Sequence, residues 1–284
     1  MDKAKKAFQA DIDATSAPDY KAFRAAGPDM GEAARQAAFA AHPGLRRYDE
    51  AFDKVFAEVQ GASAGAEGRP AVWFLYNMGL VIKTPKVTFA IDIAHRQDIR
   101  LAPLLDFALV THNHDDHVGP AMLDAVNGAG KTIVSNFLDN YGALRGASKM
   151  PGGYTRRRKV FRLGDVHIRT ALSDHNPYLK DFTTTFEITI GDWMLYHTGD
   201  SQNIARLNPT RRPDLWVVHP LCGLDVAEGV RKFHPRRVAI CHLCEMGHPP
   251  DKWRWSLMDG LREAARAEAA GAEAVVPIWG ERLV

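Results

Sequence analysis

The chain has 284 residues, of which 46% are hydrophobic and 25% charged, as in ordinary globular proteins with a sizeable core. Its 36 lysine and arginine residues against 34 aspartate and glutamate residues give a formal charge of +2, which does not favour a nucleic-acid partner. Three cysteines argue against a disulfide framework, and neither a signal-peptide-like start nor a membrane-length apolar run is seen, so we expect a cytoplasmic protein without a membrane span.

The first 60 residues are predicted to be helical. Alanine, lysine, glutamate and glutamine are abundant there, and apolar residues recur at helical spacing over residues 48–59. Pro18, Pro28 and Pro43 interrupt this pattern, because proline fits the first turn of a helix but not its interior. We therefore expect several short helices rather than one long one.

A run of small residues over 61–68 is typical of a flexible linker. We therefore expect a helical N-terminal extension and linker over residues 1–68, followed by a main domain over residues 69–284. The extension holds one histidine, His42, and no cluster of possible ligands. We expect it to pack over the main domain, or across a contact in a homo-oligomer.

From residue 71 the sequence changes to short apolar runs rich in β-branched and aromatic residues, which are typical of strands. Apolar and polar residues alternate over 184–190, as a half-buried strand requires. The expected strands are 72–76, 87–93, 107–110, 184–190, 193–196, 215–218, 238–240 and 274–278.

Two helices are expected between these strands. Residues 120–126 end in Asn127-Gly128, a helix stop signal. Residues 250–270 carry Trp253, Leu257 and Leu261 at helical spacing. Many strands with interleaved helices predict a layered α/β domain.

The densest group of chemically active side chains follows the expected strand 107–110. His112, His114, Asp116 and His117 lie within six residues of one another, and Asp115 stands among them. Loops at strand ends present ligands from a rigid scaffold, and two residues that are two apart on an extended segment project to the same side. Imidazole and carboxylate suit zinc, and also iron or manganese. The cluster predicts a loop that supplies ligands to two adjacent metal ions.

The pattern His112-x-His114-x-Asp116-His117 resembles the His-x-His-x-Asp-His signature of the metallo-β-lactamase superfamily. The resemblance covers roughly residues 71–284. It implies a four-layer αββα sandwich, in which two mixed sheets lie face to face with helices outside. It also implies that residues 69–284 form the catalytic domain.

The superfamily has further ligands downstream in the order His, Asp, His. His175 precedes the alternating strand, Asp200 follows the strand 193–196, and His242 follows the strand 238–240. The resemblance implies two divalent ions, expected to be zinc, with manganese or iron as alternatives. It assigns His112, His114 and His175 to the first ion, Asp116, His117 and His242 to the second, and Asp200 to a bridging position.

Within the superfamily, the start of the domain is most similar to one branch. Asn77-Met78-Gly79 before a strand, followed by Ile91-Asp92, resembles the opening of the branch that contains the L-ascorbate-6-phosphate lactonases and the N-acylphosphatidylethanolamine phospholipase D. The proteins of that branch often have a histidine near position 78 and Asp-Pro at the second element, where this chain has Asp92-Ile93.

The expected activity is that of a binuclear metallohydrolase. A water held by two cations becomes a hydroxide near neutral pH and would attack a carbonyl carbon or a phosphorus atom. The expected reaction is cleavage of an ester, lactone or phosphoester bond, with Asp116 and Asp200 as catalytic carboxylates. The substrate is expected to be a small molecule. The four cations over residues 156–159 fit a solvated turn, and binding of an anionic substrate is the alternative.

Other functions remain open at this point. The first is an iron-dependent, dioxygenase-like oxidoreductase on the same fold, and the second is a non-catalytic binding module. The third is a nuclease or phosphodiesterase, although no accessory nucleic-acid-binding segment is evident. Because all seven ligand positions are filled, a hydrolase is favoured over a module that has lost its site.

The histidines and cysteines outside the predicted ligand set are expected to have other roles. His197 is expected to make a structural hydrogen bond, with support of Asp200 as the alternative. His219 ends a strand and is a candidate for the pocket lining, and His248 is a candidate for substrate contact or acid catalysis. Cys241 and Cys244 are expected to be packing residues.

Overall fold

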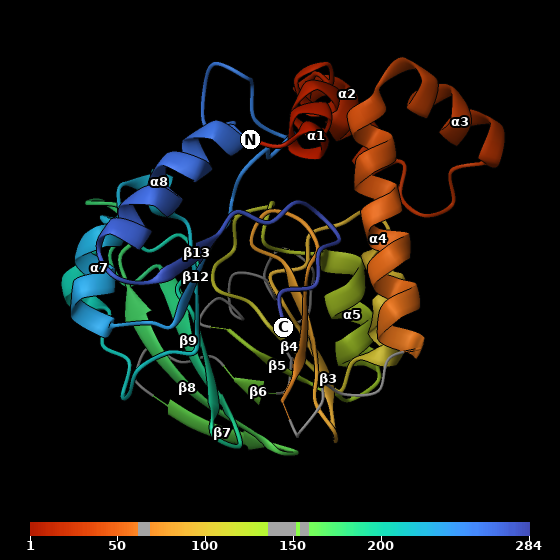
Figure 1. Ribbon diagram of the computed structural model, residues 1–284. Coiled ribbons are helices and arrows are strands. Elements are labelled where there is room, and N and C mark those ends of the chain that lie inside the picture. The colour runs from red at the N-terminus through yellow and green to blue at the C-terminus, as the bar shows by residue number, and fades with distance from the viewer. Residues whose placement is uncertain (62–68, 136–151, 154–158) are drawn as a thin grey trace.

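The computed structural model describes residues 1–61, 69–135, 152–153 and 159–284 (Figure 1). Two sheets face each other and helices lie on their outer sides, so the predicted αββα sandwich is confirmed. The linker expected over 61–68 lies, apart from its first residue, outside the described residues, as do residues 156–158 of the basic run. None of the helices in the described segments has the length and apolar character that crossing a membrane requires.

The first sheet has the order β1-β2-β3-β4-β5-β6. Antiparallel pairing joins β1 to β2 and β2 to β3, and parallel pairing continues from β3 to β6. Its strands are short and, where their burial is described, largely buried, as a sheet covered on both faces requires. They are β1 Ala71–Phe74, β2 Leu80–Lys83, β3 Thr88–Ile91, β4 Phe107–Leu109, β5 Thr132–Val134 and β6 Gly152–Gly153.

The second sheet has the order β13-β12-β11-β10-β9-β8-β7. Strands β7 to β10 pair antiparallel, and β10 to β13 pair parallel. The strands are β7 Lys159–Leu163, β8 Val166–Ser173, β9 Thr183–Ile190, β10 Trp193–His197, β11 Leu215–Val218, β12 Arg237–Ile240 and β13 Glu273–Val275. β8, β10, β11 and β12 run in one direction, so their carboxyl ends meet at one edge of the sandwich.

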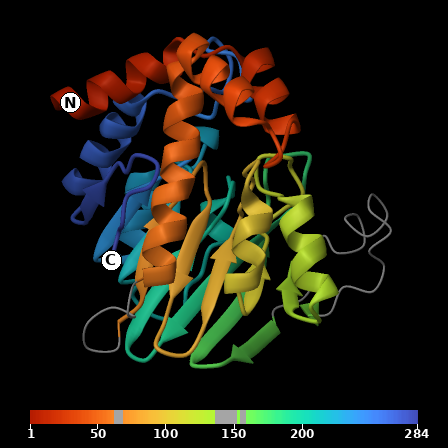
Figure 2. The same cartoon turned by 90° about the vertical axis from the view of Figure 1, so that its right-hand side faces the viewer.

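Helices cover both outer faces. α5 (Pro120–Gly128) lies on the first sheet beside the 3₁₀ helix η2 (Asp98–Leu104), and α7 (Val226–Phe233) and α8 (Leu257–Ala269) lie on the second (Figures 1 and 2). The closest fit is at Gly229 of α7, where an added Cβ would stand 2.2 Å from the ring of Trp216. A larger residue at Gly229 would push α7 off the sheet.

Four helices precede the sandwich. They are α1 (Lys3–Asp13), α2 (Ala17–Ala25), α3 (Glu32–Ala41) and α4 (Pro43–Gly61). Pro18 lies in the first turn of α2 and Pro43 opens α4, the positions where proline costs no hydrogen bond. α4 runs down the first sheet, and α1 and α2 cross the end of the sandwich at which the parallel strands finish (Figure 2).

The structure differs from the sequence-based prediction in several elements. The helix expected over 250–270 begins only at Leu257, because Ser256 and Asp259 form a capping box there. Trp253 therefore lies in a loop, with a left-handed φ of 69°, and not on a helical face. The helix α7 and the strands β2, β5, β6, β7 and β8 are not among the elements expected from the sequence.

Candidate metal centre

Every predicted ligand follows the carboxyl end of a strand, and these strand ends lie at the same edge of the sandwich. The β4 loop supplies His112, His114, Asp116 and His117, and the backbone of this loop is tied to the second sheet by a 2.7 Å hydrogen bond from the N–H of Thr184 to the carbonyl of Thr111. His175 follows β8, Asp200 follows β10 and His242 follows β12. The structure thus brings all seven residues together.

One group of donor atoms consists of Asp116 Oδ2, His117 Nε2, His242 Nε2 and Asp200 Oδ2. His242 Nε2 lies 3.0 Å from Asp116 Oδ2 and 3.4 Å from Asp200 Oδ2, and His117 Nε2 lies 3.7 and 3.5 Å from the same two oxygens. A tetrahedral zinc site with bonds near 2 Å separates its donors by about 3.3 Å. The four atoms have the spacing of one tetrahedral metal shell.

A second group shares the oxygen of Asp200. Nε2 of His112 lies 3.1 Å from Nδ1 of His114 and 3.8 Å from Oδ2 of Asp200, and His175 Nε2 lies 3.7 Å from the same oxygen. His112, His114 and His175 form one of the ligand groups that the structure offers, and Asp116, His117 and His242 form another. These two groups match the division expected from the sequence, but the structure also offers the groups His112-His117-Asp200 and Asp200-His219-His242, so the assignment of ligands to each ion stays a prediction.

The polar atoms of these groups are buried without partners. Among the described residues, His117 Nε2, His242 Nε2, both ring nitrogens of His175 and Asp200 Oδ1 make no hydrogen bond. Buried polar groups are normally paired, and each unpaired one costs about 1–3 kcal/mol. Because Nε2 of His117, His175 and His242 all lie within 3.7 Å of Asp200 Oδ2, two cations placed there would satisfy these nitrogens together, so the residues present fit a two-metal site.

The electrostatics of the cluster also call for positive charge. Burial by itself would lower the pKa of His117, but the carboxylates of Asp200, Asp116 and Asp92 raise it well above its usual value. Burial lowers the pKa of His112 well below its usual value. Without metal, His117 is therefore protonated, and its positive charge balances the nearby carboxylates. His112 stays neutral, and the neutral imidazole is the form that binds metals.

Residues behind the ligands hold them in place. Asp92 Oδ2 lies 2.9 Å from His117 Nδ1 and accepts a 2.6 Å hydrogen bond from the hydroxyl of Thr111, whose backbone N–H donates to Asp92 Oδ1 at 2.7 Å. The amide of Asn77 donates to Asp116 Oδ2 at 2.9 Å. Such contacts orient a ligand and fix the tautomer of an imidazole. From the sequence, Asn77 and Asp92 were recognised only as markers of a branch, and this supporting role was not predicted.

The backbone at the site takes conformations that most residues avoid. His242 has a φ of 62°, and its N–H donates to the carbonyl of Asn77 at 2.9 Å. Gly199 has a φ of 51°, and an added Cβ would stand 2.9 Å from the Thr111 side chain. Left-handed backbone at a non-glycine residue costs on the order of 1 kcal/mol or more and is typical of functional sites. Glycine before Asp200 lets the chain turn against the β4 loop.

Besides the seven predicted ligands, the centre contains one more histidine, His219. The sequence indicated His219 only as a residue that lines the pocket. It follows β11, its ring stacks on His242 with centroids 3.9 Å apart, and its Nδ1 lies 3.4 Å from Asp200 Oδ1. Burial lowers the pKa of His219 to about 4, so the ring is neutral. Neither ring nitrogen has a hydrogen-bond partner in the described part of the chain. His219 could have been predicted as part of the centre from its position directly after a third parallel strand of the second sheet.

A cavity of about 610 Å³ opens beside the donor groups. His114, Asp116, His175, Asp200, His219 and His242 form its inner side. Apolar and aromatic residues form much of the rest, namely Leu179, Leu221, Cys222, Trp253 and Trp255. Asp115, Asn176, Gln202 and His248 complete the lining. A volume of this size suits a small-molecule substrate.

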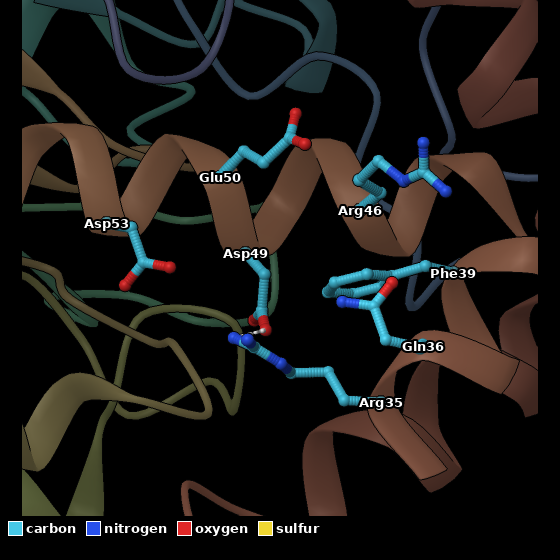
Figure 3. Close-up of a pocket in the computed structure, with 7 residues that line it drawn as sticks. All are labelled: Arg35, Gln36, Phe39, Arg46, Asp49, Glu50 and Asp53. Carbon is cyan, nitrogen blue, oxygen red and sulfur yellow. Dashed lines mark ion pairs between the residues drawn. The ribbon is translucent and has the colours of Figure 1, made fainter. Parts of the chain in front are cut away.

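Another cavity, of about 350 Å³, lies between α3 and α4 (Figure 3). Its lining mixes Arg35 and Arg46 with Asp49, Glu50 and Asp53. Asp49 is buried and also pairs with Arg96 from the sandwich. None of these residues belongs to a ligand group found among the described residues, so this cavity adds no metal chemistry.

The remaining histidines and cysteines mostly behave as expected. His197 makes the predicted structural hydrogen bond, with its Nε2 3.0 Å from the carbonyl of Met78. Cys241 and Cys244 are free, buried thiols, and burial raises the pKa of Cys244 to about 12, which makes it inert. His248 lines the cavity, and its role in substrate contact or acid catalysis stays a prediction.

Known proteins share this architecture. No model of a known protein family matches the chain. A UPF0173 metal-dependent hydrolase from Methylobacterium nodulans is 28% identical over 156 residues, which are 47% of this chain and 64%, less than two thirds, of that relative. The metallo-β-lactamase fold protein YhfI from Bacillus subtilis has a TM-score of 0.57 at 14% identity over 75% of this chain and 98% of its own. CmlA, a diiron β-hydroxylase from Streptomyces venezuelae, has a TM-score of 0.58 at 14% identity over 75% of this chain and 54% of its own.

The fold is therefore that of the metallo-β-lactamases, with a candidate metal centre where its parallel strands end. The chain is thus similar over about half its length to a UPF0173 metal-dependent hydrolase, and it shares the metallo-β-lactamase fold with these solved structures. The branch that Asn77-Met78-Gly79 indicates stays a prediction.

Proposed function

We propose that this chain is a binuclear metallohydrolase that cleaves a carboxylic ester or lactone of an uncharged small molecule. The observation that carries the proposal is the pair of tetrahedrally spaced donor groups that share Asp200 Oδ2 beside a 610 Å³ cavity. We assign His112, His114 and His175 to one ion, Asp116, His117 and His242 to the other, and Asp200 to both. Zinc suits this mixture of imidazole and carboxylate.

When bound, two divalent cations supply a water acidic enough to ionise near neutral pH and positive charge beside the scissile bond. The residues of the chain do the rest. Asp116 lines the cavity and, held by Asn77, can take up the proton of the attacking water. His219 is neutral and lines the cavity, so its ring N–H can donate to an oxygen of the substrate. No serine or cysteine nucleophile is required.

The cavity lining favours an uncharged substrate over a phosphoester. The lining residues in the described segments include three aspartates and no lysine or arginine. A phosphodiester brings its own negative charge, and sites for phosphate normally supply arginine, lysine or a helix N-terminus as partners. The apolar side chains, with Trp253 56% exposed, offer contact area for an acyl or aryl group instead. The basic run 156–159 remains the argument for an anionic substrate.

The second candidate is an iron-dependent oxidoreductase. It is favoured by the likeness to CmlA, a diiron β-hydroxylase with the same fold. The donors of the first group are three imidazoles and one shared carboxylate, a set that zinc and iron can both use. A cytoplasmic location, which the three free cysteines support, is compatible with both candidates.

The test is a substrate screen of the full-length protein loaded separately with zinc and with iron. We expect the zinc form to hydrolyse p-nitrophenyl esters and lactones much faster than bis-p-nitrophenyl phosphate, with loss of activity in chelator and recovery on adding zinc. Oxygen consumption by the iron form without hydrolysis of any ester or lactone would support the oxidoreductase and overturn the proposal. Preferred hydrolysis of the phosphodiester would overturn the substrate assignment alone.

A further inference from the structure

Two loops frame the candidate metal centre, and both contact the N-terminal helices. We call residues 112–119, after β4, the metal loop, and residues 245–255, which include His248 and Trp253, the aromatic loop. We propose that α1 and α2 hold both loops in position through two arginines, Arg24 and Arg254, so that the N-terminal extension is a working part of the site. The sequence predicted that the extension packs over the main domain or across a contact in a homo-oligomer and is not a component of the metal site; this proposal departs from that prediction by giving the extension a supporting role at the site.

Arg24 reaches from α2 to the metal loop. Its Nη2 donates to the backbone carbonyl of Asp115 and, at 3.4 Å, to that of Val118, and its Nη1 lies 3.9 Å from the carboxylate of Asp115. The two carbonyls stand directly before and after Asp116 and His117, which are assigned to the second ion. Arg24 therefore holds the backbone around two of the three ligands that the second ion does not share with the first.

The partner of Arg24 is the backbone of the loop, which matters energetically. Carbonyls in a tight loop have no partner from a helix or sheet. Val118 is buried, so its carbonyl, left unpaired away from water, would cost about 1–3 kcal/mol, whereas water can reach the carbonyl of the exposed Asp115. A planar guanidinium donates in several directions at once, so it can hold two carbonyls that a lysine could not hold together. Loss of these hydrogen bonds would let Asp116 and His117 shift by fractions of an ångström, which is enough to lower the affinity of a metal site.

Arg254 makes the matching connection from the aromatic loop to α1. Its side chain is buried; Nε donates to the carbonyl of His248 at 2.8 Å and Nη2 to that of Met246 at 2.8 Å. Nη1 donates to the carbonyls of Thr15 at 2.6 Å and Ile12 at 3.3 Å, at the carboxyl end of α1. Carbonyls at that end of a helix lack partners within the helix and attract cations.

A tyrosine cluster joins the two contacts. Tyr20 of α2 stacks on Tyr76, with ring centroids 5.9 Å apart. The hydroxyl of Tyr76 donates to the buried carboxylate of Glu245 at 2.7 Å and accepts from the N–H of Met246 at 2.9 Å. α2 therefore packs against the first residues of the aromatic loop as well as against the metal loop.

The test for Arg24 is titration of the full-length, metal-free protein with Co²⁺, followed by its visible absorption, which reports the coordination of each ion without any substrate. We expect Arg24→Met to lower the affinity for the second Co²⁺ ion by about 10-fold or more, as loss of a residue that supports a ligand typically does. The affinity for the first Co²⁺ ion should not change. Arg24→Lys should fall between Arg24→Met and wild type, and it carries the test alone if Arg24→Met does not fold. The control is Arg47→Met, which removes a surface arginine of α4 that pairs with Asp11.

The test for Arg254 is hydrogen exchange of the aromatic loop. We expect Arg254→Lys to bind both Co²⁺ ions normally. The backbone amide hydrogens of residues 245–255 should exchange about 10-fold faster, because the four carbonyls that accept from Arg254 lose most of their donors. If both Arg24 variants bind two ions normally, the part of the proposal that concerns Arg24 is overturned. If hydrogen exchange in Arg254→Lys is unchanged, the part that concerns Arg254 is overturned. Since no substrate is used, these results do not depend on whether the protein is a hydrolase.

Discussion

Oδ2 of Asp92 lies 2.9 Å from Nδ1 of His117, on a buried carboxylate that also accepts hydrogen bonds from the N–H and the hydroxyl of Thr111. This contact makes Nδ1 the protonated nitrogen and leaves the lone pair of Nε2 facing Asp116 and Asp200. Asp92 thus sets the tautomer that a metal-binding histidine needs.

Asp92→Asn is therefore expected to weaken metal binding while the protein stays folded. Asparagine tolerates the left-handed φ of 50° at this position, so the backbone need not change, but its neutral side chain orients His117 less well. We expect metal affinity to fall about 10- to 100-fold, measured by competition with a chelator. Asp165→Asn, at the turn before β8, removes an acid bonded to Thr84 and serves as control. Equal affinity in wild type and Asp92→Asn would rule out the orienting role.

The aromatic loop should govern substrate binding more than chemistry. Trp253→Ala removes an exposed ring from the cavity wall, far from the donor atoms in sequence and not among the assigned ligands. Burying an aromatic side chain contributes about 1.5–3 kcal/mol, so KM for an aryl or long-chain ester should rise roughly 10- to 100-fold, with little change in kcat. Met258→Ala, an exposed residue of α8, is the control. A fall in kcat with KM unchanged would contradict a binding role for Trp253.

The buried acid Asp98 should make stability depend on pH. Burial raises its pKa to about 7, although the N–H groups of Ile99 and Met122 oppose the shift. Between about pH 4 and 7 the folded protein therefore holds a proton that the unfolded chain has lost, and stability falls as pH rises through this window, by up to about 1.4 kcal/mol per unit.

Asp98→Asn lacks this titration. The melting temperature of the variant minus that of wild type should increase steadily from pH 5 to pH 7.5. Above pH 7.5 this difference should level off. The comparison of the two proteins at each pH removes the contribution of the other acids. A difference in melting temperature that stays constant over the whole range would show that Asp98 ionises normally in the folded state.

The sequence predicted most of the metal site because its signals are local. Four of the ligands lie in one loop, Asp200 and His242 each follow an apolar run that was predicted as a strand, and His175 was recognised by the alternating strand that comes after it. The supporting contacts could not be predicted in this way, because Arg24 and Asp115 are 91 residues apart, and Arg254 and Thr15 are 239 apart. No pattern within a segment reveals a partner at that distance.

Local patterns also explain what was missed. Trp253 has helical spacing to Leu257, but the cap formed by Ser256 and Asp259 stops the helix before it. β2, β5 and β7 span three to five residues, too few for a period to be distinguished from chance. His219 stands alone in sequence and joins the cluster only because β11 lies between β10 and β12.

Asp200→Ala should reduce turnover far more than it reduces stability. Oδ2 of Asp200 lies within 3.8 Å of ring nitrogens from His112, His117, His175 and His242, so its loss separates the two donor groups. Misplacement of about 1 Å can cost on the order of 100-fold in rate, and one ion should bind more weakly. The measurements are hydrolysis rate, metal content and melting temperature.

The matched control for Asp200→Ala is another carboxylate beside a ligand. Asp174 precedes His175, but it accepts hydrogen bonds from Asn203 at 2.9 Å, the N–H of Asp181 at 3.0 Å and Arg206 at 3.2 Å, so its loss would itself destabilise the fold. Asp115, whose side chain is 89% exposed in the metal loop, is the better control, and Asp115→Ala should keep both ions. A near-normal rate with two ions in Asp200→Ala would mean that Asp200 does not bridge.

The most direct test of the account is the number of metal ions that one chain binds. Elemental analysis of the full-length protein, reconstituted with zinc and freed of loosely bound metal, should give close to two ions per chain, because each of the two proposed donor groups has three ligands of its own besides Asp200. A folded protein that retains no transition metal would contradict the candidate metal centre, and one that retains a single ion would contradict the binuclear assignment.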